Sequence, residues 1–276
     1  MAERRYEHAP AHTLPGLLQR GRGLGARMAA EDPAAAAELV YGCIRWDWRW
    51  DSVDQRALYL ARLVRDSAAP LGPVVKMLAR GEGVRERATG VLELLALDGP
   101  GEAGDALRAC AREGKRSVAA LEETSREQAE VHNAALVELP ADHGEAEDVP
   151  VLVAQLERDW AARRWCGPKR TAEGLRRLGP DARDAVSLLR RFWLWTPHSY
   201  ERASYLEALA AIEPAGLESV HTECLWDCEA EARLLGIAHA PDGPEVRERL
   251  GYLRDDPMEE PGVRAAAGER LAALTG

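Results

Sequence analysis

Apolar residues recur along the chain with the period of an α-helix. Five segments align on one arginine each: Arg56, Arg87, Arg202, Arg233 and Arg264. Within each half of the chain, neighbouring arginines of this set are 31 residues apart. Small or apolar residues stand one, four and seven positions after each arginine, as Ala57, Leu60 and Leu63 do, and these positions share one face of a helix. The pattern predicts helical hairpins that repeat with a period near 31 residues.

Sequence signals for helix starts agree with this period. Signals for strands are almost absent. Asp32 precedes Pro33 as an N-cap precedes a first-turn proline, and Pro180, Pro197 and Pro214 also open apolar runs. A short hairpin cannot bury its apolar face alone, so repeated hairpins must stack on their neighbours. The sequence therefore predicts an all-α protein built as an α-solenoid.

The phase of the repeat breaks near the middle of the chain. Arg87 and Arg202 are 115 residues apart, which is not a multiple of the period. Proline, glycine and acidic residues cluster without an apolar period in residues 139–150. We therefore expect an N-terminal block over residues 1–138, an irregular linker over 139–150 and a C-terminal block over 151–276, stacked as one continuous solenoid.

Two features resemble short bacterial HEAT-like repeats. One is the Val-Arg pair at Val84-Arg85 and Val263-Arg264, and the other is the spacing of six residues between Asp227 and Arg233. The stretches RWDWRWDSVD, TPHSYERASYLEALAAIEP and ECLWDCEAEAR also resemble an actinobacterial HEAT-repeat family that has no assigned function. The resemblance implies a scaffold with a concave surface, in which an aspartate of one repeat meets an arginine of another. A fold of this kind does not by itself give a function.

Composition narrows the possible partners and the compartment. The chain has 36 basic and 46 acidic residues and a net charge of -10, which disfavours nonspecific binding to nucleic acid. No apolar stretch approaches the twenty or so residues of a membrane span, and the N-terminus lacks the apolar core of a signal peptide. An odd count of five cysteines suits free thiols in a reducing compartment. We expect a cytoplasmic protein that does not enter a membrane.

The segment Trp50-Asp51-Ser52-Val53-Asp54 is similar to the W-D-x-V-D sequence of HEAT-like alkylpurine DNA glycosylases. That resemblance implies that Trp50 stacks near the damaged base, that Asp54 stabilises positive charge on the sugar, and that Arg87 contacts a phosphate. A structural role is the other interpretation: the tryptophans cap the solenoid and an aspartate caps a helix. Base excision is therefore the alternative hypothesis for the function.

His221, Cys224 and Cys228 are spaced so that they share one helical face. A structural zinc site needs four ligands, usually in paired short motifs, and no second motif of this kind occurs in the chain. We expect two buried core cysteines beside a partly exposed histidine, with no metal and no cofactor.

Residues 158–195 concentrate positive charge and tryptophan in an acidic half of the chain. This stretch has ten basic and four acidic residues, which give a local net charge of +6. Arginine and tryptophan are enriched at binding hot spots, although a run of charges is often only a solvated helix face. The leading hypothesis is a non-enzymatic scaffold that binds a protein with an acidic surface, with nucleic acid as a less favoured partner. The predicted binding residues are Arg163, Arg164, Trp165, Lys169, Arg170, Arg176, Arg177, Trp193 and Trp195.

Overall fold

The structure is a computed structural model that describes residues 8–46, 55–98, 101–114 and 145–275. Within these ranges every regular element is a helix and no strand occurs. The prediction of an all-α protein is therefore confirmed.

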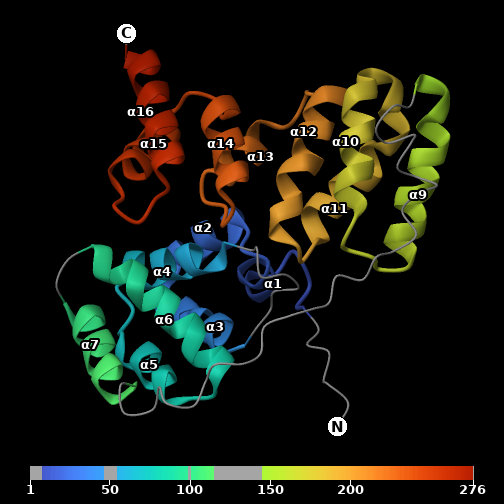
Figure 1. Ribbon diagram of the computed structural model, residues 1–276. Helices are drawn as coiled ribbons and strands as arrows, with labels where there is room; N and C mark the ends of the chain where they lie inside the picture. Colours follow the sequence, from blue (N-terminus) through green and yellow to red (C-terminus); the bar gives the residue numbers. More distant parts are fainter. Residues whose placement is uncertain (1–7, 47–54, 99–100, 115–144, 276) are drawn as a thin grey trace.

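The N-terminal part forms one layer of the molecule (Figure 1). Its elements are α1 (Leu14–Gln19), α2 (Gly23–Glu31), α3 (Pro33–Arg45), α4 (Arg56–Asp66), α5 (Gly72–Val75), the 3-10 helix η1 (Lys76–Ala79), α6 (Glu82–Leu97) and α7 (Glu102–Gly114). The helices α3, α4 and α6 contact one another and bury Ile44, Val64 and Leu92 between them. Asp32 caps α3 as the sequence predicts, since its side chain accepts a hydrogen bond from the Ala35 backbone N–H.

The C-terminal part is a row of helices that follow one another in chain order across the molecule (Figure 1). They are α9 (Val149–Ala161), α10 (Pro168–Leu178), α11 (Val186–Trp195), α12 (Arg202–Ile212), α13 (Glu218–Cys224), α14 (Ala230–His239), α15 (Pro244–Asp255) and α16 (Pro261–Thr275), with 3-10 helices η2 (Ala146–Asp148), η3 (Gly179–Ala185) and η4 (Ser199–Glu201). Consecutive helices pair as α9 with α10, α11 with α12, α13 with α14 and α15 with α16. Contacts also run from α10 to α12, from α12 to α14 and from α14 to α16.

Part of the segment expected to be an irregular linker is helical. Of residues 139–150 the structure describes 145–150, which contain η2 and the first residues of α9. Pro150 lies in the first turn of α9, where a proline has no hydrogen bond to break. The cluster of proline and acids is therefore in part a helix start.

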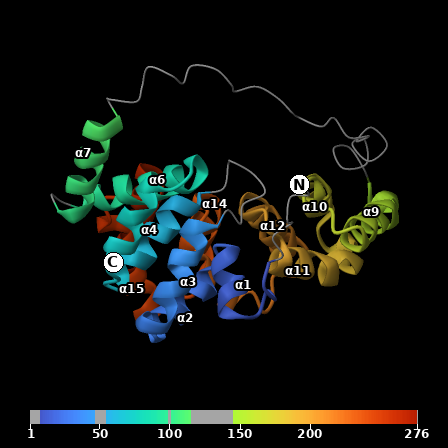
Figure 2. The ribbon, with the colours of Figure 1, turned by 90° about the horizontal axis from the view of Figure 1, so that it is seen from below.

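The two parts pack against each other along α1, α2 and α4 (Figure 2). The side chains of Cys228 and Met258, from the C-terminal part, belong to the apolar core of the N-terminal part. The two parts therefore share one core at their junction.

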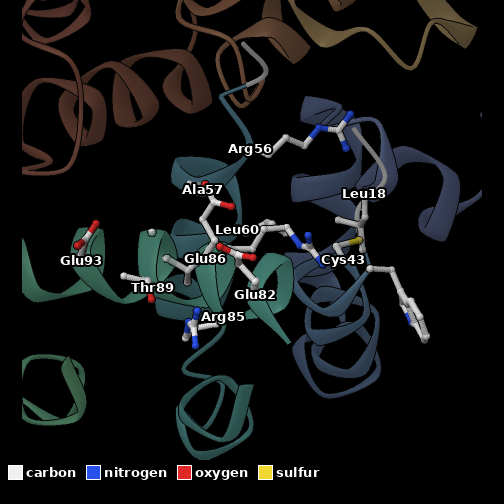
Figure 3. A pocket seen from close by; sticks show the side chains of 14 residues that line it. Leu18, Cys43, Arg56, Ala57, Leu60, Glu82, Arg85, Glu86, Thr89 and Glu93 are labelled. Carbon is white, nitrogen blue, oxygen red and sulfur yellow. The ribbon is translucent and has the colours of Figure 1, made fainter. Parts of the chain in front are cut away.

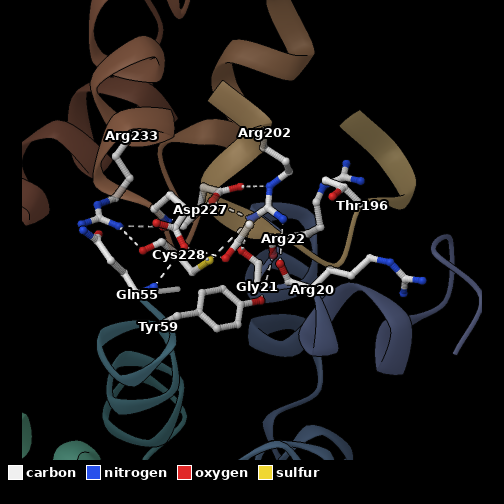
Figure 4. A network of polar contacts seen from close by, with 12 residues as sticks. Arg20, Gly21, Arg22, Gln55, Tyr59, Thr196, Arg202, Asp227, Cys228 and Arg233 are labelled. Atoms are coloured by element: carbon white, nitrogen blue, oxygen red, sulfur yellow. Dashed lines mark hydrogen bonds and ion pairs between the residues drawn. The ribbon is translucent and has the colours of Figure 1, made fainter. Parts of the chain in front are cut away.

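A buried polar network around Arg202 joins the two parts (Figure 4). Arg202 Nη1 donates to the Arg20 carbonyl at 2.8 Å and Nη2 donates to the Gly21 carbonyl at 3.3 Å. The same guanidinium binds both carboxylate oxygens of Asp227, at 3.1 and 2.8 Å. Gly21 has a φ of +64°, and a Cβ there would lie 2.4 Å from Cys228 Sγ, so the close approach requires glycine.

A second link of the same kind runs along the C-terminal row. Arg233, near the start of α14, binds Glu259 at 2.8 Å, just as Arg202 at the start of α12 binds Asp227. Each acid lies shortly before the next helix of the series α12, α14 and α16. The spacing of six residues marks Asp227 but misses Glu259, which lies five residues before Arg264.

The five aligned arginines differ in burial and position. Arg56 and Arg202 are the first residues of α4 and α12, Arg233 and Arg264 are the fourth residues of α14 and α16, and Arg87 is the sixth residue of α6. The side chains of Arg56, Arg202 and Arg233 are buried, whereas Arg264 is exposed.

Further buried ion pairs connect the N-terminal helices to the C-terminal row. Arg22 binds Glu223 with two hydrogen bonds of 2.6 and 2.8 Å. Arg62 on α4 binds both Asp256 and Glu259, at 2.7 and 2.8 Å. Burying charges costs desolvation that their attraction only partly offsets, so such pairs define the register of packing more than they add stability.

Glu201 connects η4 to the start of α10. Its Oε1 accepts a hydrogen bond from the Gly167 backbone N–H at 3.1 Å, and its other oxygen accepts one from the Tyr205 hydroxyl. Burial raises the pKa of Glu201 to about 7, although these hydrogen bonds favour the carboxylate. The carboxyl group is therefore partly protonated near neutral pH.

We predict that Asp227→Ala destabilises the protein by about 3–5 kcal/mol, because it leaves the buried Arg202 charge without its carboxylate. The double change Arg202→Met with Asp227→Leu should cost less, because it removes both charges. Urea unfolding followed by circular dichroism measures these differences. Asp242→Ala, which breaks an exposed pair with Arg247, is the matched control and should leave the midpoint nearly unchanged. Equal effects of Asp227→Ala and Asp242→Ala would contradict the assigned role.

We also predict that the stability of the wild type, relative to Glu201→Gln, falls by about 1–3 kcal/mol as the pH rises from 5 to 8. The pKa of this group is raised in the folded state, so its contribution is complete below the ordinary value of 4.5 and is lost as the pH rises toward about 7. Glutamine removes this titration. Unfolding curves of both proteins across the pH range test the prediction, and parallel profiles would refute it.

Candidate binding surface

Four aromatic side chains gather where α9 ends, at the α9–α10 loop and at the end of α11. Trp160 meets Trp165 at a centroid distance of 5.7 Å, Phe192 at 5.5 Å and Trp195 at 6.4 Å, all edge to face. Phe192 is buried, and the three tryptophans are partly exposed. The cluster therefore combines a fixed apolar base with an accessible edge.

The local sequence forms the loop that presents this edge. Arg163 adopts a left-handed φ of 51°, and Gly167 adopts a φ of 110° as the N-cap of α10. Only glycine reaches the second conformation without strain, and Pro168 then starts the helix. The turn places Trp165 back against Phe192 at 6.0 Å.

Three arginines lie on the segments that carry the aromatic cluster. Arg163 and Arg164 are exposed on the loop, and Arg191 on α11 lies over the Trp160 ring at 5.9 Å. Arg164 binds the buried carboxylate of Asp159 at 2.9 Å. Burial raises the pKa of Asp159, and the contacts of this carboxylate with Gln155 and Arg164 oppose that rise. We call this set the Arg–Trp surface; it comprises Trp160, Arg163, Arg164, Trp165, Arg191 and Trp195.

The basic residues of α10 form a separate group. They occupy the solvent side of the helix, opposite the buried Thr171, Ala172 and Leu175, and they are Lys169, Arg170, Arg176 and Arg177. Figure 2 shows α10 and α11 at different levels of the row. Arg176 of this group pairs with Glu207 on α12.

Trp193 lies away from both groups. Its side chain is only 5% exposed and packs against the Arg22 guanidinium, whose centre is 3.9 Å from the ring centroid. Of the nine predicted residues, Arg163, Arg164, Trp165 and Trp195 come together in the Arg–Trp surface. Trp193 instead contributes to the junction of the two parts.

Sequence reasoning did not select several residues that shape this region. Trp160, Arg191 and Phe192 were outside the predicted set, although all three lie in the same stretch. Glu207 and Glu213 lie outside the stretch, yet they pair with Arg176 and Arg190 and lower the local positive charge. Helical spacing relates neighbours within one helix but not the partners on another, so no sequence signal marks these acids.

A cleft of about 610 Å³ lies in the N-terminal part, between the end of α3, the start of α4 and one side of α6 (Figure 3). Its charged lining comprises three arginines and three glutamates, namely Arg56, Arg85, Arg87, Glu82, Glu86 and Glu93. Such a balanced lining does not make the positive groove that DNA phosphates require.

The residues of the base-excision hypothesis are only partly placed. Trp50 and Asp54 lie outside the described residues. Arg87 lines the cleft, and its guanidinium donates to the carbonyls of Ile44 and Arg45 at 2.9 and 2.8 Å. These are the last carbonyls of α3, so Arg87 caps a helix end.

The histidine and cysteines of the HTECLWDC segment are all buried. His221 is 8% exposed, less than expected, because its ring packs against His239 with centroids 5.1 Å apart. Burial raises the pKa of the thiols of Cys224 and Cys228 well above the ordinary value. Across the described ranges, no three histidine, cysteine or acidic side chains are placed to hold a metal ion.

No helix in the described part of the chain combines the length and apolarity needed to cross a membrane. Comparisons of the chain with protein-family models, with curated proteins and with solved structures find no match.

Proposed function

We propose that this chain is a HEAT-like repeat scaffold that binds an acidic segment of another protein at the Arg–Trp surface. The observation that carries the proposal is the pairing of exposed guanidinium groups with partly exposed tryptophans on a rigid aromatic base. Neither Arg163 nor Arg191 forms an ion pair with a described residue. Both charges are therefore available to a partner.

The repeat architecture is supported by the order of contacts in the C-terminal row. Each hairpin touches the next through the helices α10, α12, α14 and α16. Arg202 and Arg233 are 31 residues apart and each binds an acid of the following hairpin, which fits a unit that recurs about every 31 residues.

The chemistry of the surface favours a carboxylate partner. Guanidinium groups bind carboxylates with paired hydrogen bonds, and partly exposed tryptophan contributes large contact area at low entropy cost. Leu194, which is 40% exposed on α11, adds an apolar contact one turn from Arg191. The partner segment is therefore acidic with interspersed apolar residues, and the net charge of -10 disfavours nucleic acid.

We predict that the triple change Arg163→Glu, Arg164→Glu and Arg191→Glu weakens binding of an acidic, leucine-containing peptide about tenfold or more at low salt. The reversal replaces attraction by repulsion, and salt screening should reduce the difference. Fluorescence polarisation of a labelled peptide of alternating glutamate and leucine measures the affinity at two salt concentrations.

The matched control carries the same charge change on exposed arginines elsewhere, Arg80→Glu, Arg85→Glu and Arg183→Glu. It should bind the peptide nearly as the wild type does. Equal weakening in both triple variants would show that only net charge matters and would contradict the proposed surface. Tighter binding of a single-stranded oligonucleotide, or release of methylated purines from DNA that is lost in Asp54→Asn, would also overturn the proposal.

A further inference from the structure

A second groove of the N-terminal part, with a volume of about 390 Å³, lies where α3 ends and α6 begins. Its other walls are α5 and η1, which both pack against α6 (Figure 1). Sites for small molecules usually have volumes of roughly 300–1,000 Å³. The groove shares no residue with the Arg–Trp surface. It is therefore a separate candidate for a small ligand.

Apolar side chains make up half of the lining. Trp46 directly follows α3, Pro73 lies in the first turn of α5, Met77 belongs to η1 and Val84 lies in the first turn of α6. Met77 is only 4% exposed, whereas Trp46 is 44% exposed. An apolar chain that covers these side chains loses contact with water together with them, and this favours binding.

The other side chains of the lining are all basic. They belong to Arg45, Lys76 and Arg80, and Gly81 completes the lining. The three basic residues are exposed, and within the described residues none of them forms an ion pair with a carboxylate. No acidic residue lines this groove. The groove thus differs from the larger cleft, whose arginines and glutamates balance.

The start of α6 adds positive potential to the groove. Gly81 is the N-cap of this 16-residue helix, and no side chain caps the helix there. The uncapped N–H groups of a helix start carry partial positive charge. Glu82, in the first turn, offsets part of this charge, but it lines the larger cleft instead. A Cβ at Gly81 would meet no atom within 4 Å, so the N-cap lies beside open space.

This combination of charge and apolar surface restricts the chemistry of the ligand. An uncharged apolar molecule gains only the burial of its chain, and a polyanion such as DNA leaves the apolar side chains in water. A molecule with one apolar chain and one carboxylate uses both halves of the lining.

We propose that this groove binds a medium-chain fatty acid as its free carboxylate. The carboxylate accepts hydrogen bonds from the basic side chains of the rim, and the chain covers Trp46 and Met77. This site is independent of the proposed scaffold function and goes beyond it.

The test is calorimetric titration of the whole protein with sodium octanoate, octan-1-ol and octylammonium chloride, each below the concentration at which it forms micelles. Octanoate should bind at least about tenfold more tightly than octanol, because its head group forms charge-assisted hydrogen bonds. Octylammonium should bind less tightly than octanol. From hexanoate to decanoate, each added methylene should tighten binding about twofold to fourfold. Equal affinities for the three head groups, or for all chain lengths, would overturn the proposal.

A triple variant tests the head-group contacts. Arg45→Gln, Lys76→Gln and Arg80→Gln together remove the three charges and keep most of each side chain. Octanoate should then bind about as weakly as octanol, whose affinity should stay unchanged. The control carries the same change of charge in the C-terminal row, namely Arg163→Gln, Arg183→Gln and Arg191→Gln. It should bind octanoate as the wild type does.

A matched pair of single variants locates the ligand at the groove if the triple variant fails to fold. Val84→Glu places a carboxylate in the lining and should weaken octanoate binding at least about tenfold relative to Val84→Gln. A helix start tolerates both side chains at this position.

Equal loss of octanoate binding in the control triple variant, or equal affinities of Val84→Glu and Val84→Gln, would contradict the site. Binding to vesicles of anionic lipid without any binding of octanoate would indicate a lipid surface instead, and would also overturn the proposal.

Discussion

The buried guanidinium of Arg202 is the contact on which the rest of the structure depends. It reaches from the start of α12 to the backbone carbonyls of Arg20 and Gly21, and it binds Asp227 ahead of α14. One side chain thus joins the turn before α2 and two successive hairpins of the C-terminal row. Apolar contacts alone tolerate sliding, whereas a buried charge with fixed partners tolerates only one register.

The other buried arginines extend the same constraint to the whole junction. Arg233 holds Glu259 ahead of α16, Arg62 reaches that acid from α4, and Arg22 holds Glu223 at the end of α13. Shared acids couple the pairs to one another, so displacement of one helix would leave several charges without partners. The N-terminal helices are in this way bound to a particular part of the row.

The proposed binding surface follows from arginines that lack such internal ion pairs. Within the described residues, neither Arg163 nor Arg191 pairs with a carboxylate. An exposed guanidinium beside partly exposed tryptophans favours a solvated acidic segment.

The sequence by itself determined the helical content and the positions at which many helices start. Apolar spacing and N-terminal prolines act over a few residues, and the helices that begin at Pro33, Pro168 and Pro244 obey these local rules. The alignment of arginines also singled out Arg56, Arg202 and Arg233, whose side chains proved to be buried at the junction. These features depend on contacts within one helix or on a pattern that repeats.

Only the tertiary structure decided what each arginine binds. Arg202 and Arg264 have the same place in the alignment, yet one is buried between two parts and the other is exposed on the last helix. Trp193 and Trp195 are two residues apart, and one faces Arg22 in the junction while the other joins the surface cluster. The partner of a side chain depends on which distant segments fold against it. Glu223, which binds Arg22, is 201 residues away in the sequence, and the spacing of residues within one helix cannot predict such a contact.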